Sequence, residues 1–186
     1  LTMELLTILY VVLGVVAVWL IFTYNRLVLL RYRAKEAMSD IDVQLKRRFD
    51  LVPNLVETVK GYMQHEKSVL ENVTRARTAV AGGGNTLERE KAEKQLSNTL
   101  KTLFAVSENY PDLKANANFL ELQRELSDTE NKIQASRRFY NSTVMALNTS
   151  VNTFPTNLIS KPLGFHEEKF FEVESAAEKE PVKVKF

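Results

Sequence analysis

Apolar residues dominate a stretch near the start of the chain and then recur at every third or fourth position along most of it. The stretch is residues 5–22, which hold no charge and are interrupted only by Thr7 and Gly14. As a helix rising 1.5 Å per residue they would span roughly 27 Å, close to the hydrocarbon thickness of a bilayer. A small domain could not cover such a helix on every side, and a secretory signal would need a basic start and a small-residue cleavage site. We therefore predict a retained transmembrane anchor over residues 1–23.

The periodic part of the chain predicts amphipathic helices, because apolar side chains spaced by three and four share one helical face. We expect four, at about residues 24–52, 53–81, 86–109 and 118–154. Pro53 disfavours a helical conformation at Val52 and suits the first turn of a new helix. Glycines at 82–84 break the second helix, and Asn85 with Glu88 is the expected start of the third. The core-facing positions include Leu27, Leu30, Ala34, Ala37, Ile41, Leu45 and Val52 in the first helix, and Phe119, Leu122, Leu126, Ile133, Tyr140, Val144, Leu147, Val151 and Phe154 in the last.

These helices predict an all-α fold. Residues 24–155 are expected to form an elongated up-down four-helix bundle, whose first helix continues directly from the anchor. Phe154 and Tyr140 are expected to be packed in its core. Residues 156–186 are expected to be an apolar connector followed by a charged, extended tail. The alternating end of that tail, residues 181–186, could pair as strands, clip onto the bundle, bind a partner or stay disordered.

Basic residues mark one flank of the predicted anchor. Arg26, Arg31, Arg33 and Lys35 follow it, and no basic residue precedes it. The positive-inside rule places such a flank in the cytoplasm. We expect a single-pass protein of the bacterial cytoplasmic (inner) membrane, with the N-terminus outside and the C-terminal domain cytoplasmic, anchored in the lipid bilayer.

Composition removes several classes of function. The chain has no cysteine, so it has no disulfide scaffold, thiol nucleophile or cysteine-ligated metal. The two histidines, His65 and His166, lack the spacing of a zinc hydrolase or a ferritin-like metal site. A net charge of +2 does not suggest nucleic-acid binding. We expect no enzyme activity, no catalytic, cofactor-binding or metal-binding residues, no cofactor, no nucleic-acid partner and no small-molecule substrate.

Two groups of charged residues remain to be explained. One lies at the end of the first predicted helix and the other along the last. Their members are Lys46, Arg47, Arg48 and Asp50, and Glu121, Arg124, Glu125, Glu130, Arg137 and Arg138. The favoured interpretation is a solvated surface with weak pairs between residues three and four apart. The alternative is that some of them lie near the helix seam and set its register.

Ordered stretches over nearly the whole chain resemble the LemA family of bacterial proteins. The stretches are YN at 24–25, RRFDLVPNLVETVKGY at 47–62, HE at 65–66, LQREL at 122–126, TENKI at 129–133, RRFYN at 137–141, FPTNL at 154–158, GF at 164–165 and VKF at 184–186. The resemblance implies one N-terminal membrane helix and a cytoplasmic domain of long helices, without a defined activity. It also implies an association with a membrane metalloprotease of the HtpX type. The chain is similar to a magnetosome protein too, which favours a membrane-organising role.

Three functions stay open at this point. The leading hypothesis is a non-enzymatic, membrane-anchored helical scaffold that binds protein partners or forms a homo-oligomer. The second is a regulatory subunit or adaptor of a membrane protease, and the third is an undetected enzyme. Gly14 has no small residue four positions away, since Tyr10 and Val18 occupy those places, so the anchor lacks a close-packing glycine motif. Self-association is therefore expected from the helical domain.

Overall fold

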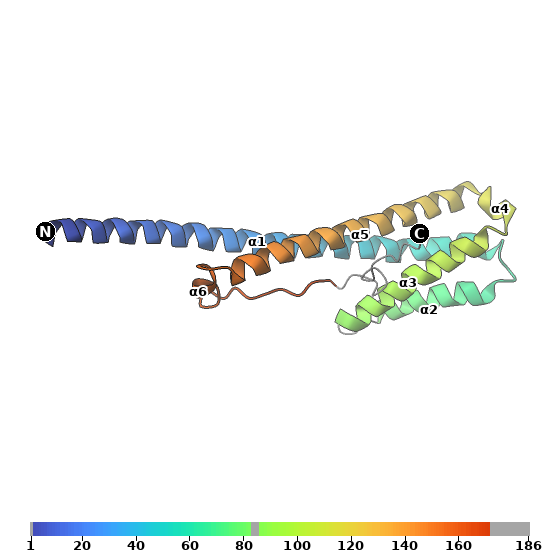
Figure 1. The fold of residues 1–186 in the computed structure, drawn as a ribbon. Coiled ribbons are helices and arrows are strands. Elements are labelled where there is room, and N and C mark those ends of the chain that lie inside the picture. The colour runs from blue at the N-terminus through green and yellow to red at the C-terminus, as the bar shows by residue number, and fades with distance from the viewer. Residues whose placement is uncertain (1, 83–85, 172–186) are drawn as a thin grey trace, which may run out of the picture. The chain divides into compact units, whose positions relative to one another are not determined.

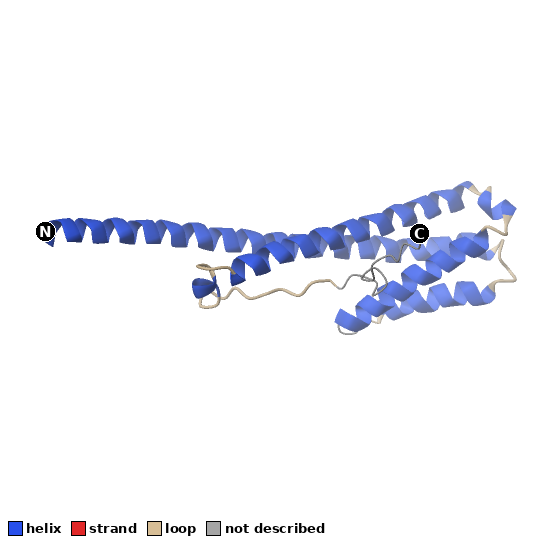
Figure 2. Ribbon diagram, viewed as in Figure 1, coloured by secondary structure: helices blue, strands red, loops and turns tan. Residues whose placement is uncertain are grey.

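The fold comes from a computed structural model, which describes residues 2–82 and 86–171. Within these residues all regular secondary structure is helical (Figure 2). This confirms the all-α class. The helices are α1 (Thr2–Lys60), α2 (Lys67–Ala81), α3 (Thr86–Ser107), α4 (Pro111–Lys114), α5 (Ala117–Asn152) and α6 (Asn157–Ser160).

Helix α1 is longer than the sequence predicted. It runs for 59 residues as one helix, with Pro53 inside it (Figure 1). The expected break at Val52 and Pro53 is therefore wrong, and so is the second helix expected to begin there. The chain instead turns after Lys60, and α2 begins at Lys67.

The contacts of Phe49 explain why the proline is tolerated. A proline has no N–H, so Pro53 cannot bond the carbonyl of the residue four positions earlier. That carbonyl belongs to Phe49, and Arg77 of α2 donates its Nε–H to it at 3.2 Å. The Arg77 guanidinium also lies 4.0 Å from the centre of the Phe49 ring. A side chain from α2 thus replaces the hydrogen bond that the proline removes from α1.

The remaining boundaries agree with the sequence to within a few residues. Helix α3 ends before Tyr110, as expected. The first turn of α5 is capped by Asn116, whose side-chain oxygen accepts from the Phe119 N–H at 3.0 Å. The expected start signal at Asn85 lies outside the described residues.

Phe154 corrects the expectation for the end of the last helix. Helix α5 stops at Asn152, so the helical periodicity that would bury Phe154 no longer applies there. The side chain is 74% exposed. Tyr140 is half-buried.

The chain divides into two compact units. One contains residues 39–136 and the other residues 1–38 with 137–186. We call them the 39–136 unit and the terminal unit. The sequence predicted one domain beyond the anchor and gave no sign of this division.

The 39–136 unit has a core that draws on five helices. Its buried members are Val52, Leu55, Val59, Met63, Val73, Ala76, Leu96, Leu100, Leu103, Leu113, Phe119 and Leu126. The predicted apolar stripes therefore face this core. The finer prediction of an up-down four-helix bundle stays a prediction.

The terminal unit has a smaller core in its described part. Leu27 of α1, Leu147 and Val151 of α5, and Phe165 are buried together there. After α6 the chain turns back, and residues 165–171 run along α5 without regular secondary structure (Figure 2). The predicted tail end at residues 181–186 lies outside the described residues.

The N-terminal part of α1 is apolar and uncovered. Its most apolar window of 18 residues has a mean hydropathy of 2.8, and none of it is buried. Among the described residues α1 is the one helix long and apolar enough to cross a membrane. It is therefore the candidate membrane anchor.

Candidate functional site

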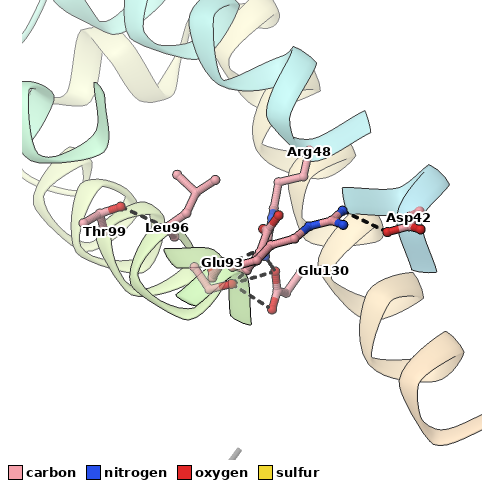
Figure 3. A network of polar contacts seen from close by, with 8 residues as sticks. Asp42, Arg48, Glu93, Leu96, Thr99 and Glu130 are labelled. Carbon is pink, nitrogen blue, oxygen red and sulfur yellow. Dashed lines mark hydrogen bonds and ion pairs between the residues drawn. The ribbon is translucent and has the colours of Figure 1, made fainter. Parts of the chain in front are cut away.

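A buried arginine is the most unusual polar feature of the 39–136 unit. Arg48 lies in α1, and its side chain is 1% exposed. Figure 3 shows it pointing from α1 toward Glu93 of α3 and Glu130 of α5. A buried guanidinium is stable only when carboxylates or other acceptors surround it. The partners of Arg48 therefore define the site.

Hydrogen bonds join Arg48 to two helices. Its Nη1 donates to Ser97 Oγ and to Glu130 Oε2, both at 2.5 Å. Its Nη2 donates to the carboxylate of Glu93 and, at 3.3 Å, to the Glu93 main-chain carbonyl. Ser97 also lies 3.2 Å from the Glu130 carboxylate. Arg48, Glu93, Ser97 and Glu130 form what we call the Arg48 network.

Spacing along α3 brings two of these partners together. Glu93 and Ser97 are four residues apart, so they lie on one face of the helix and one above the other. Both are buried. Glu130 comes from α5 and is 22% exposed. The network thus ties three helices that are far apart in sequence to one guanidinium.

The chemistry of the Arg48 network is structural. An arginine stays protonated at any physiological pH, so Arg48 can neither accept nor deliver a proton in catalysis. Both carboxylates are engaged by it. Removing Arg48, or removing its carboxylate partners, would leave a buried charge without compensation. The arrangement fixes how α1, α3 and α5 meet, and the network hydroxyl that lies against a carboxylate, Ser97 Oγ, also accepts a hydrogen bond from Arg48.

A groove lies beside the network. It has a volume of about 660 Å³ and runs between α3 and α5. Leu100, Phe104 and Leu126 supply its apolar lining, and Ser97 and Glu130 of the network lie in its wall. The Arg48 network therefore also holds the two sides of this groove in place.

The structure divides the charged groups that the sequence singled out. Arg47 pairs with Glu125 at 3.7 Å, and both are exposed. Lys46 and Asp50 form a similar exposed pair at 3.7 Å. For these residues the favoured interpretation, a solvated surface, is right. For Arg48 and Glu130 it is wrong, because both reach into the helix seam.

Glu93 and Ser97 were missed by the sequence analysis. A signal was present, since both fall where the apolar stripe of α3 continues toward Leu96 and Leu100. Arg48 likewise lies on the stripe of α1, three residues beyond Leu45. Charged residues at stripe positions on several helices can pair across a core.

The two histidines take no part in this site. His65 and His166 are both exposed. In residues 2–82 and 86–171 no group of three or more histidine, aspartate or glutamate side chains could hold a metal ion. The Arg48 network is thus built without either histidine.

Comparison with known proteins gives a consistent picture. The sequence profile described as the LemA family matches residues 37–186, which excludes the apolar segment at 5–22. Protein LemA of Metamycoplasma hominis is 27% identical over 139 residues, which cover 74% of this chain and 64% of that protein. The chain therefore matches less than two thirds of that relative's length.

Magnetosome proteins are similar over more of the chain. Magnetosome protein MamQ 2 of Paramagnetospirillum magneticum is 25% identical over an alignment that covers 86% of this chain and 68% of the relative. Magnetosome protein MamQ of Magnetospirillum gryphiswaldense is 23% identical with the same coverage. Both alignments extend over more of this chain than the alignment with Protein LemA does.

Proposed function

The chain belongs to the LemA family, and from this premise we propose that it is a non-enzymatic, membrane-anchored helical scaffold that assembles with further copies of itself. The main support for this proposal is that α1 combines an apolar, uncovered part with a part that is packed in a core. One continuous helix contains an uncovered apolar segment near the N-terminus and buried core positions from Leu27 to Val59. Such a helix can lie in a bilayer at one end and organise a helical domain at the other.

The basic flank supports a cytoplasmic location for the helical domain. Arg26, Arg31, Arg33 and Lys35 are all exposed on α1, directly after the apolar segment. Exposed cations at that level can contact anionic headgroups, with a contribution of about 1 kcal/mol each. We propose that the anchor crosses the bacterial inner membrane with its N-terminus outside.

The Arg48 network supports a scaffold over an enzyme. Its residues are joined to one another by hydrogen bonds and ion pairs, and they hold three helices together. A fixed helical surface suits the binding of proteins, and an anchor confines every copy to one plane, which raises the local concentration. Weak lateral contacts between copies then become effective.

An experiment on the intact protein distinguishes scaffold from protease adaptor. The tagged full chain is extracted with its native lipids into polymer nanodiscs, and the mass and protein content of the particles are measured. A scaffold gives particles that contain several copies of this chain. An adaptor instead gives one copy with a stoichiometric membrane metalloprotease, and either that result or single copies alone would overturn the proposal.

A further inference from the structure

Residues 165–171 bind α5 through their main chain. We call this segment the strap. Asn148 of α5 donates its Nδ2–H to the Glu168 carbonyl at 2.9 Å and accepts from the Glu168 N–H at 2.9 Å. Asn141 makes the same two bonds with Phe171, at 2.9 Å and 2.8 Å. Each side-chain amide thus pairs with one residue of the strap as a neighbouring β-strand would.

The spacing of the two asparagines matches an extended peptide. Asn141 and Asn148 are seven residues apart, about 10.5 Å along a helix, and Glu168 and Phe171 are three apart, about 10 Å in an extended chain. The strap therefore runs antiparallel to α5 with two helical turns for every three of its residues. Tyr140 adds a further main-chain contact, because its hydroxyl donates to the Lys169 carbonyl at 3.1 Å.

Aromatic side chains hold the two ends of the strap. Phe165 is buried against Leu27, Leu147 and Val151. Phe171 meets the Tyr140 ring edge-to-face, with centroids 5.6 Å apart. Between these ends, residues 166–170 are exposed. The α5 face thus bonds the main chain of the strap at Glu168 and Phe171, and an aromatic side chain packs at each end of the strap.

The next proposal rests on the self-assembly proposed above and identifies the surface through which two copies meet. We propose that the α5 face around Asn141 and Asn148 is a binding site for extended peptide, and that copies of this chain assemble by exchanging straps across this site. A second copy carries the same segment with the same aromatic ends. Its strap makes every contact that the chain's own strap makes.

The position of the site favours a second copy as the occupant. Phe165 packs on Leu27, which lies five residues beyond the apolar stretch at 5–22, about 7.5 Å along α1. All anchored copies therefore present the site at the same height above the bilayer. The strap also follows Gly164, whose φ of +78° is a left-handed conformation that glycine adopts readily, so rotation there can redirect it. Because Phe165 follows Gly164 directly, exchange of the whole strap requires two copies to lie side by side, as anchoring in one plane allows.

Cysteine crosslinking tests the exchange cleanly, because the chain contains no native cysteine. We call the pairs Asn141–Phe171 and Asn148–Glu168 the two asparagine clamps. Asn152 Nδ2 lies 2.9 Å from Glu167 Oε1, and neither of these residues belongs to a clamp. Two full-length variants, Asn152→Cys and Glu167→Cys, carry different tags and are expressed together. Membranes are then treated with a short bis-maleimide, and the product that carries both tags is measured.

The proposal predicts a crosslinked product with both tags. Asn141→Leu with Asn148→Leu in the Asn152→Cys copy should lower its yield at least about tenfold, because four hydrogen bonds are lost. A matched control replaces Asn152→Cys by Ala146→Cys, which is exposed but lies well away from the clamp face of the helix, and it should give little product. Far-UV circular dichroism checks that the leucine variant stays helical.

One chain that carries both cysteines provides the opposing result. If this double variant crosslinks internally while the mixed copies give no product with both tags, the strap stays in its own chain and the proposal is wrong. Co-purification of the two tags without that product would reject strap exchange but keep self-assembly. Absence of co-purification would reject self-assembly as well.

Discussion

Replacing Arg48 by methionine should destabilise the 39–136 unit strongly. Methionine fills much of the space but leaves Glu93 buried and both carboxylates without their cation. Breaking a buried ion pair in this way costs about 3–5 kcal/mol of unfolding free energy. In a unit of roughly 100 residues, 1 kcal/mol shifts the melting temperature by about 4–8 °C, so we expect a fall of roughly 12 °C or more.

The assay is thermal unfolding of the purified full chain in detergent, followed by far-UV circular dichroism. The matched control is Arg47→Met, one residue earlier in α1, because both side chains of the Arg47–Glu125 pair are exposed. An exposed pair contributes at most about 1 kcal/mol, so this variant should melt close to the native chain. Equal melting temperatures for the two variants would refute the importance of the Arg48 network.

A further variant tests the physical reason for the loss. The triple change Arg48→Met, Glu93→Leu and Glu130→Leu removes all three charges, so most of the lost stability should return. A triple variant less stable than Arg48→Met would show that packing, and not charge, sets the cost.

The remaining predictions concern other contacts. Arg77→Met should cost about 1–2 kcal/mol, and less in a Pro53→Ala background, where the restored N–H bonds the freed carbonyl; additive losses in denaturant unfolding would contradict this. Burial, and to a lesser extent the charge of Glu168, raises the pKa of Tyr140 above its usual 10.0. The protonated hydroxyl stabilises the bound strap, so its contribution is fully present below about pH 10 and is lost as the pH rises through the raised pKa. Glu168→Gln should lower that pKa, measured from phenolate absorbance with a Tyr140→Phe reference, and an unchanged titration would exclude the contact. Phe165→Ala should cost about 3–5 kcal/mol, and an unshifted unfolding midpoint would mean that the ring is not packed.

Periodicity predicted the helices well and their ends less well. Apolar spacing located the core face of α1 from Leu27 to Val52, because that face depends on local order alone. It could not show that α1 continues through Pro53, since the missing hydrogen bond is replaced by Arg77, which is distant in sequence. The same limit explains Phe154, whose burial required two more helical residues than α5 has.

The polar contacts were predictable only in part. Arg48 and Glu130 stood out as charged residues, but their burial depends on a carboxylate that α3 brings to them. Glu93 could have been noticed as a charge on an apolar stripe. The asparagine clamps had no such signal, because Asn141 and Asn148 are ordinary surface residues until residues 168 and 171 lie against them.

Counting copies in the native membrane tests the central claim most directly. The full chain, fused at its C-terminus to a fluorescent protein and expressed at its native level, is counted by photobleaching steps in single membrane spots. Residues 1–26 with the same fusion serve as the control. A membrane-anchored scaffold that assembles through its helical domain predicts two or more steps for the full chain and one step for the control. One step for the full chain, or equal counts for both, would contradict the account.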